Sequence, residues 1–162
     1  GYDLDKLVEL GNKVVKNLKT MGMSLKACTV FTTGKESFEI ADDEVEIGLG
    51  IHGEPGTHRE KMATANEFTE KLFEKIYTES DVQKGDRFAV LVNGLGETTL
   101  IELFNINNHL QDLLKAKGVE VAKTLVGNYM TSLDMGGFSI TLLKLDNEME
   151  ELLKAEEDTI AF

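Results

Sequence analysis

Apolar residues recur every three or four positions in four segments of the chain, a spacing that predicts helices. The first segment begins at Leu4, and Gly22 is expected to end it. The other three segments cover 64–78, 99–117 and 147–156. The predicted buried positions of 64–78 are Phe68, Leu72, Phe73 and Ile76, and those of 99–117 are Leu100, Leu103, Phe104, Leu110, Leu113 and Leu114.

Shorter apolar runs predict strands, which we place at 25–30, 38–40, 45–51, 88–92, 119–126 and 138–145. A strand, a helix and a second strand follow one another over 88–126, which makes a βαβ unit and a parallel strand pair. The strands of the first third resemble hairpins, which are antiparallel. Residues 1–162 are therefore expected to form a single α/β domain, with a mixed, partly parallel sheet flanked by helices.

Charge and composition narrow the class of protein. The 162 residues carry 17 basic and 29 acidic side chains, for a net charge of −12. Such an acidic chain argues against nucleic acid and anionic membranes as partners. The single cysteine, Cys28, excludes an internal disulfide and fits a reducing compartment, so we expect a cytoplasmic protein. No apolar run reaches the ~18 residues of a membrane span, and the start does not resemble a signal peptide.

The strand predicted at 45–51 ends beside a histidine. Its alternation puts Gly48, Gly50 and His52 on one face, where the glycines leave room for a ligand or another backbone. A histidine with space around its ring, on a rigid strand end, is suited to chemistry. A structural histidine that caps the following loop is an equally good interpretation of the same residues.

Two other groups of residues, a possible metal site and a possible hydrolase site, are weaker candidates for a functional site. His52, Glu54 and His58 lie within seven residues, but Pro55 breaks their register, so we expect no metal site. His58 and His109 are expected on the surface, and Cys28 in the core. Ser132 or Ser139 with Asp134 and His52 would suit a hydrolase, but the G-x-S-x-G motif is absent.

A glycine-bearing loop at 93–99 joins a predicted strand to a predicted helix. Such a loop can bind an anion at the helix N-terminus. It matches neither phosphate-binding glycine motif and has no lysine to neutralise a phosphate. A tight turn, with Thr98 or Thr99 as the helix N-cap, is the favoured interpretation.

Three of these segments together resemble one family. Residues 46–56 read E-I-G-L-G-I-H-G-E-P-G, residues 93–96 read N-G-L-G, and residues 129–142 read Y-M-T-S-L-D-M-G-G-F-S-I-T-L. In this order and spread over most of the chain, they resemble the motifs of dihydroxyacetone kinases. The resemblance is to the dihydroxyacetone-binding subunit of the phosphotransferase-system-dependent type, and within it to the C-terminal half.

The resemblance implies a function for His52. In the family, this histidine bonds through its tele nitrogen to the substrate carbonyl carbon and forms a hemiaminal. Gly50 and Gly53 would leave space for the three-carbon substrate. The resemblance further implies that this chain binds no cofactor and that ADP or ATP with Mg is bound by a partner nucleotide-binding subunit. It also implies that a phosphotransferase-system protein supplies the phosphoryl group and that the chain forms a homodimer.

The resemblance also limits what this chain should do. The family's general acid and base belong to an N-terminal domain, so no residue here receives those roles and the chain alone is expected to be inactive. The chain ends at Phe162, soon after the last predicted helix, which favours the multi-subunit type over a fused kinase. The alternative is a non-catalytic, dihydroxyacetone-sensing co-activator, in which His52 would serve as well.

Overall fold

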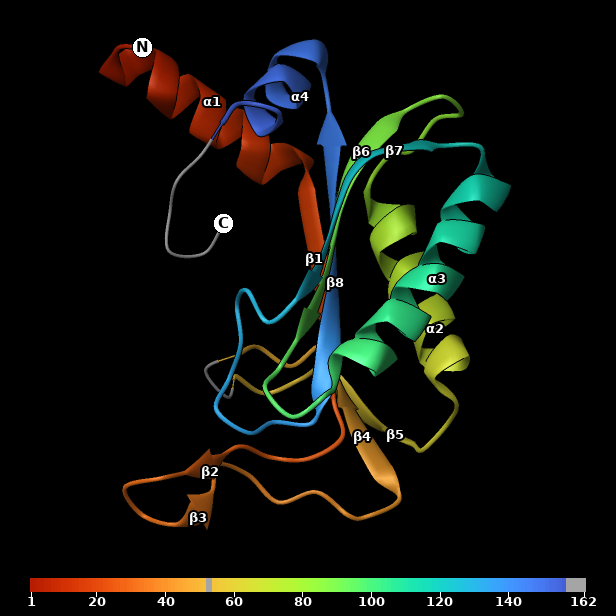
Figure 1. The fold of residues 1–162 in the computed structure, drawn as a ribbon. Coiled ribbons are helices and arrows are strands. Elements are labelled where there is room, and N and C mark those ends of the chain that lie inside the picture. The colour runs from red at the N-terminus through yellow and green to blue at the C-terminus, as the bar shows by residue number, and fades with distance from the viewer. Residues whose placement is uncertain (52–53, 157–162) are drawn as a thin grey trace.

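The computed structural model describes residues 1–51 and 54–156, which fold around a six-stranded sheet (Figure 1). The elements are α1 (Leu4–Asn17), β1 (Leu18–Ser24), β2 (Thr29–Val30), β3 (Lys35–Glu36), β4 (Glu44–Ile47), β5 (His58–Lys61), α2 (Ala65–Glu79), β6 (Arg87–Gly94), α3 (Leu100–Lys117), β7 (Glu120–Gly127), β8 (Gly137–Leu145) and α4 (Asn147–Leu153). Among the described residues, no helix is long and apolar enough to cross a bilayer.

The sheet is mixed, as predicted. Its strand order is β5-β4-β1-β8-β6-β7, and β6 and β7 are its parallel neighbours. The crossover between them is α3, which confirms the βαβ unit. The other neighbouring pairs are antiparallel.

Helices α2 and α3 cover one face of the sheet and bury the main core (Figure 1). The four predicted core positions of α2 are all buried. In α3 the prediction is partly wrong, because Leu100 and Phe104 are 55% and 54% exposed while Ile106 is buried. Apolar residues fall on two sides of the first turns of α3, so the sequence pattern did not show which side packs on the sheet.

The start of the chain departs most from the prediction. The first helix ends at Asn17, and Gly22 lies inside β1 rather than at a helix end. All seven residues of β1 pair with β8, from Leu18 opposite Leu143 to Ser24 opposite Gly137. This long-range pairing turns 18–24 into a central strand, which the local apolar spacing could not indicate.

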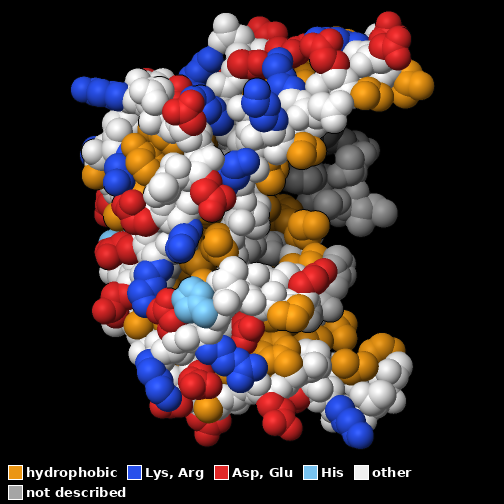
Figure 2. All heavy atoms as spheres, turned by 180° about the vertical axis from the view of Figure 1, so that it is seen from behind, with side chains coloured by type: hydrophobic (Ala, Val, Ile, Leu, Met, Phe, Trp, Pro, Cys, Tyr) orange, Lys and Arg blue, Asp and Glu red, His pale blue; other side chains and the backbone are white. Residues whose placement is uncertain are grey.

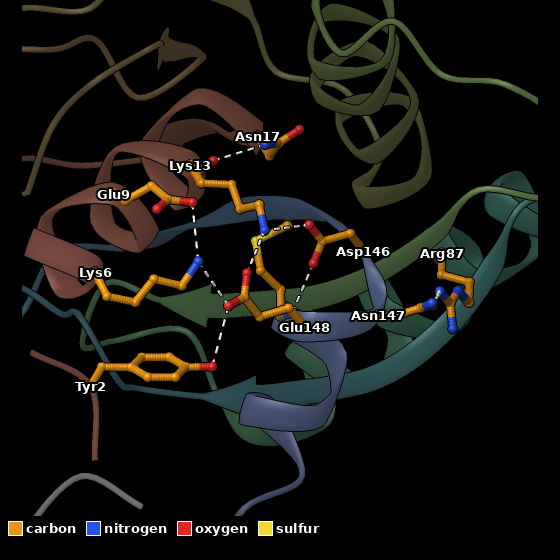
Figure 3. Close-up of polar contacts among 10 residues, drawn as sticks. Tyr2, Lys6, Glu9, Lys13, Asn17, Arg87, Asp146, Asn147 and Glu148 are labelled. Carbon is orange, nitrogen blue, oxygen red and sulfur yellow. Dashed lines mark hydrogen bonds and ion pairs between the residues drawn. The ribbon is translucent and has the colours of Figure 1, made fainter.

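Helix α1 is attached to α4 by polar contacts, and none of its residues is buried (Figure 3). Lys13 Nζ lies 2.6 Å from Asp146 Oδ2 and 2.7 Å from Glu148 Oε2. Lys6 and the Tyr2 hydroxyl also contact Glu148. The apolar side of α1 faces outward, with Leu4 and Val15 each 74% exposed.

Residues 25–51 contain less strand than expected. The strands predicted at 25–30 and 38–40 are replaced by the two-stranded hairpin β2–β3, whose turn lies at 31–34. The strand predicted at 45–51 ends at Ile47, and the chain leaves the sheet at Gly48, where φ is +81°. Figure 2 shows hydrophobic side chains along the concave side of the molecule, between α1 and this hairpin.

Candidate functional site

The three motif segments meet at one end of the sheet, the lower end in Figure 1. The Leu95 N–H donates to the Gly137 carbonyl at 3.2 Å, and the Glu97 N–H donates to the Met135 carbonyl at 3.2 Å. These segments bury a second small core of Cys28, Leu49, Leu95 and Met135, against which Phe38 and Ile51 pack. Leu49 and Met135, from segments far apart in the sequence, are thereby brought into one core, and Cys28 is a core residue as predicted.

Asn93, at the end of β6, is the polar centre of this assembly. It is 1% exposed. Its side-chain oxygen accepts hydrogen bonds from the Tyr129 and Met130 N–H groups at 2.9 and 2.8 Å. Its side-chain nitrogen donates to the Met130 carbonyl at 2.7 Å and to Ser139 Oγ at 3.4 Å. One buried amide therefore fixes the start of the third motif segment.

The loop after β4 carries the first motif and is attached to the sheet at both ends. At its start, the Gly48 N–H donates to the Gly22 carbonyl at 2.7 Å. At its end, the Gly56 N–H donates to Glu46 Oε1 at 2.9 Å. His52 and Gly53, the predicted nucleophile and its neighbour, lie outside the described residues.

The space beside Gly50 is taken by the loop itself. A Cβ atom at Gly50 would lie 2.2 Å from Glu54 Oε2, so a larger residue would displace that carboxylate. The Gly50 N–H also points to the Glu54 carbonyl at 3.4 Å. The glycine therefore permits a close approach between the two sides of the loop.

A cavity of about 490 Å³ opens between the motif loops and the β2–β3 hairpin. It is lined by Cys28, Val30, Ser37, Ile51, Thr131, Ser132, Leu133 and Met135. Ile51 directly precedes His52 in the sequence, and 131–135 belong to the third motif. The volume lies in the range of small-ligand sites.

The remaining candidate residues make structural contacts. Asp134 Oδ1 accepts the Thr29 N–H at 2.7 Å, and this bond lowers the pKa of the carboxyl. Ser132 lines the cavity, whereas Ser139 accepts from Asn93. The structure thus gives Asp134 and Ser139 roles in holding loops, which does not favour the hydrolase interpretation.

The other two histidines have side-chain partners near the surface. His58 lies 2.9 Å from Thr57 Oγ1 and 2.8 Å from Glu60 Oε1, and His109 lies 2.8 Å from Glu70 Oε1. In the glycine-bearing loop, Thr99 is the N-cap of α3, and Glu102 accepts from its N–H at 2.8 Å. Thr99, one of the two expected residues, is thus confirmed as the helix N-cap.

Two site residues, Asn93 and Glu46, were not recognised individually from the sequence. Each is a polar residue of a strand, is the first residue of a motif segment, and is at least nine-tenths buried. Buried polar side chains are usually hydrogen-bonded. A polar first residue of a motif, in or directly after a predicted strand, is the signal that could have identified them.

The fold and the converging loops define a mixed α/β domain with a ligand-sized cavity at one end of its sheet. The Dak1 domain model matches residues 1–161, and the chain belongs to this family. It is 48% identical over 163 residues to the dihydroxyacetone-binding subunit DhaK of PTS-dependent dihydroxyacetone kinase 1 from Listeria innocua, covering 100% of this chain and 50% of the relative. The subunit DhaK of the PEP-dependent dihydroxyacetone kinase from Escherichia coli is 38% identical, and the match covers 99% of this chain and 52% of that relative.

Solved structures agree with this assignment. The dihydroxyacetone kinase operon co-activator DhaQ superposes with a TM-score of 0.81 at 35% identity, over 93% of this chain and 47% of that one. The dihydroxyacetone kinase of C. freundii gives a TM-score of 0.79 at 26% identity, over 96% of this chain and 28% of that one. The chain spans about half the length of the DhaK relatives it matches.

Proposed function

We propose that this chain is the substrate-binding part of a dihydroxyacetone kinase and that it captures dihydroxyacetone covalently on His52. The observation that carries the proposal is the meeting of the first and third motif segments around one cavity, lined by Ile51 and by 131–133. The names of the DhaK relatives as dihydroxyacetone-binding subunits support the choice of ligand.

The capture is an addition to the ketone. Nε2 of a neutral His52 imidazole attacks the carbonyl carbon, and a C–N bond forms as the carbonyl π bond breaks. The former carbonyl oxygen takes up a proton, and the imidazole loses its Nδ1 proton to solvent, so the hemiaminal is neutral. Glycerol has no carbonyl carbon to attack, so covalent capture selects ketones over polyols.

The captured substrate is then held for phosphoryl transfer. Such a transfer depends mainly on positioning the acceptor hydroxyl against the donor phosphate. We assign the donor to a separate nucleotide-binding subunit that carries ADP or ATP with Mg and is rephosphorylated by a phosphotransferase-system protein. In this proposal, the chain itself binds no nucleotide and is active only with the other half of its subunit. It forms a homodimer and works in the cytoplasm.

A second candidate is a co-activator that senses dihydroxyacetone without phosphorylating it. Its support is the similarity to DhaQ, at 35% identity over 93% of this chain. Both functions use the same capture. Turnover distinguishes them: the full-length subunit, mixed with its nucleotide-binding partner and a phosphoryl donor, forms dihydroxyacetone phosphate only if it is a kinase component.

Carbon NMR of carbonyl-labelled dihydroxyacetone tests the capture directly. With the wild-type chain, a new tetrahedral carbon signal should replace part of the carbonyl signal. His52→Ala should remove that signal while the amide spectrum of the folded protein persists. A tetrahedral signal that survives in His52→Ala would show that another group captures the substrate.

A further inference from the structure

Glu46 stands out as a buried carboxylate beside the loop that carries His52 in the sequence. We propose that Glu46 is a positioning residue, which holds the end of the loop 48–56 on the sheet and thereby supports capture of dihydroxyacetone. The second part of this inference rests on the proposed function. The first part stands on the contacts of Glu46 alone.

Both oxygens of the Glu46 carboxylate are engaged, each by a different part of the chain. Oε1 accepts the Gly56 N–H at 2.9 Å, and Oε2 accepts Nε of Arg59 at 2.7 Å. Arg59 is the cross-strand partner of Glu46 in the β4–β5 pair. Glu46 is 8% exposed, and a buried carboxylate is stable only when it is paired and hydrogen-bonded. The site is therefore built around these two donors.

The backbone packs tightly where Glu46 meets the loop. A Cβ atom at Gly56 would lie 2.4 Å from the Ile47 carbonyl oxygen and 2.8 Å from Cγ of Glu46. The next residue, Thr57, donates its N–H to the same Ile47 carbonyl at 2.6 Å. The returning end of the loop therefore lies directly against β4, with the Glu46 side chain beside it.

The opposite end of the loop is fixed independently. The Gly48 N–H bonds to Gly22 of β1, and Leu49 packs in the second core. A connection attached at both ends samples fewer conformations, and the rate of a covalent step depends steeply on the placement of its groups. Release of the Gly56 end should therefore weaken the capture without unfolding the sheet.

The hydrogen bonds predict what each substitution should do. Glu46→Gln has nearly the same size but presents an NH₂ group to one of two donors, so it cannot accept from both Gly56 and Arg59. Glu46→Asp keeps the charge beside Arg59 but withdraws the carboxylate by one methylene. Glu44→Gln is the matched control, because Glu44 lies on the same strand, is half-buried, and lies 3.7 Å from Lys61 rather than contacting the loop.

The test uses two measurements on the full 162-residue chain. Amide hydrogen exchange at Gly56, followed by nitrogen NMR, reports the bond itself. Carbon NMR with carbonyl-labelled dihydroxyacetone reports the capture. We expect Glu46→Gln and Glu46→Asp to accelerate Gly56 exchange by about tenfold or more, as for loss of a charged hydrogen bond, and to weaken capture by a similar factor. Glu44→Gln should change neither.

Each outcome decides one part of the proposal. Unchanged Gly56 exchange in both Glu46 variants would show that Glu46 does not hold the loop. Faster exchange with wild-type capture would show that the contact has no role in positioning. If the wild-type chain gives no tetrahedral carbon, the proposed function fails, and the Gly56 exchange rates still decide whether Glu46 fixes the loop.

Discussion

Asn93 and Met130 bond to each other as paired residues of neighbouring strands do, although one partner is a side chain. The Met130 N–H donates to Asn93 Oδ1 at 2.8 Å, and Asn93 Nδ2 donates to the Met130 carbonyl at 2.7 Å. Asn93 is buried, whereas Tyr129 and Met130 are 38% and 63% exposed, and no strand pairs with 128–130 at this position. The amide of Asn93 therefore replaces a strand at the point where the third motif crosses the sheet end.

Asn93→Ala should destabilise the protein strongly. The substitution removes the acceptor of the Tyr129 and Met130 N–H groups, and each such hydrogen bond contributes about 0.5–1.5 kcal/mol. We expect the free energy of unfolding, measured with urea, to fall by about 2 kcal/mol. Asn108→Ala, at an exposed position of α3, is the control and should change stability little. Equal stability of the two variants would contradict this role of Asn93.

Gly50→Ala should disturb the first motif loop. The new Cβ atom would meet Glu54 Oε2 at 2.2 Å, so the carboxylate must move. Under the proposed function, we expect capture of dihydroxyacetone to weaken by about tenfold, as for a misplaced reacting group. Adding Glu54→Ala should recover part of that loss, because it removes the atoms that the methyl group displaces. A double variant as weak as the single one would indicate a different cause, which carbon NMR of both variants would detect.

The buried side of α3 can be checked with neighbouring residues. Leu103 is 0% exposed, and Leu103→Ala should lower the free energy of unfolding by about 2–5 kcal/mol. Phe104 is 54% exposed, and Phe104→Ala should change it by only about 0.5 kcal/mol. Urea denaturation of both variants is the measurement. A larger loss from Phe104→Ala would contradict the packing described for α3.

Attachment of α1 to α4 should depend on pH. Hydrogen bonds from Lys13 lower the pKa of Asp146 and of Glu148 below their ordinary values of 3.8 and 4.5. Because folding lowers these pKa values, the ion pairs stabilise the structure above the ordinary values, and their contribution is lost as the pH falls through the lowered ones. We expect the amide signals of α1 to shift towards those of a detached helix in that acidic range.

Lys13→Met is the control for the pH dependence. It removes the cation that contacts both carboxylates, so α1 should already be loosely held at neutral pH. Its amide signals should then change less on acidification than those of the wild type, because of the described ion pairs between α1 and α4 only that of Lys6 with Glu148 remains. A transition as large as that of the wild type in Lys13→Met would place the responsible groups elsewhere.

Much of the second half of the chain was predictable. The strand–helix–strand order over 87–127 and the final strand and helix follow from long apolar segments with clear ends, such as Thr99 before α3 and Gly118 after it. In these segments, local spacing and tertiary packing favour the same structure. At 18–24 they disagree, because pairing with β8 outweighs the helical spacing of the preceding residues.

For the candidate site, too, some features could be predicted from the sequence and others depended on the tertiary structure. The sequence by itself determined which segments carry it, because the motif residues are local patterns of residue types, and His52, Gly50 and Gly53 could be named from them. Only the tertiary structure decided that Asn93 holds 129–130, that Glu46 holds Gly56, and that Ile51 shares a cavity with 131–133. These contacts join residues that are far apart in the chain or across a loop, and their geometry depends on the order and register of the strands.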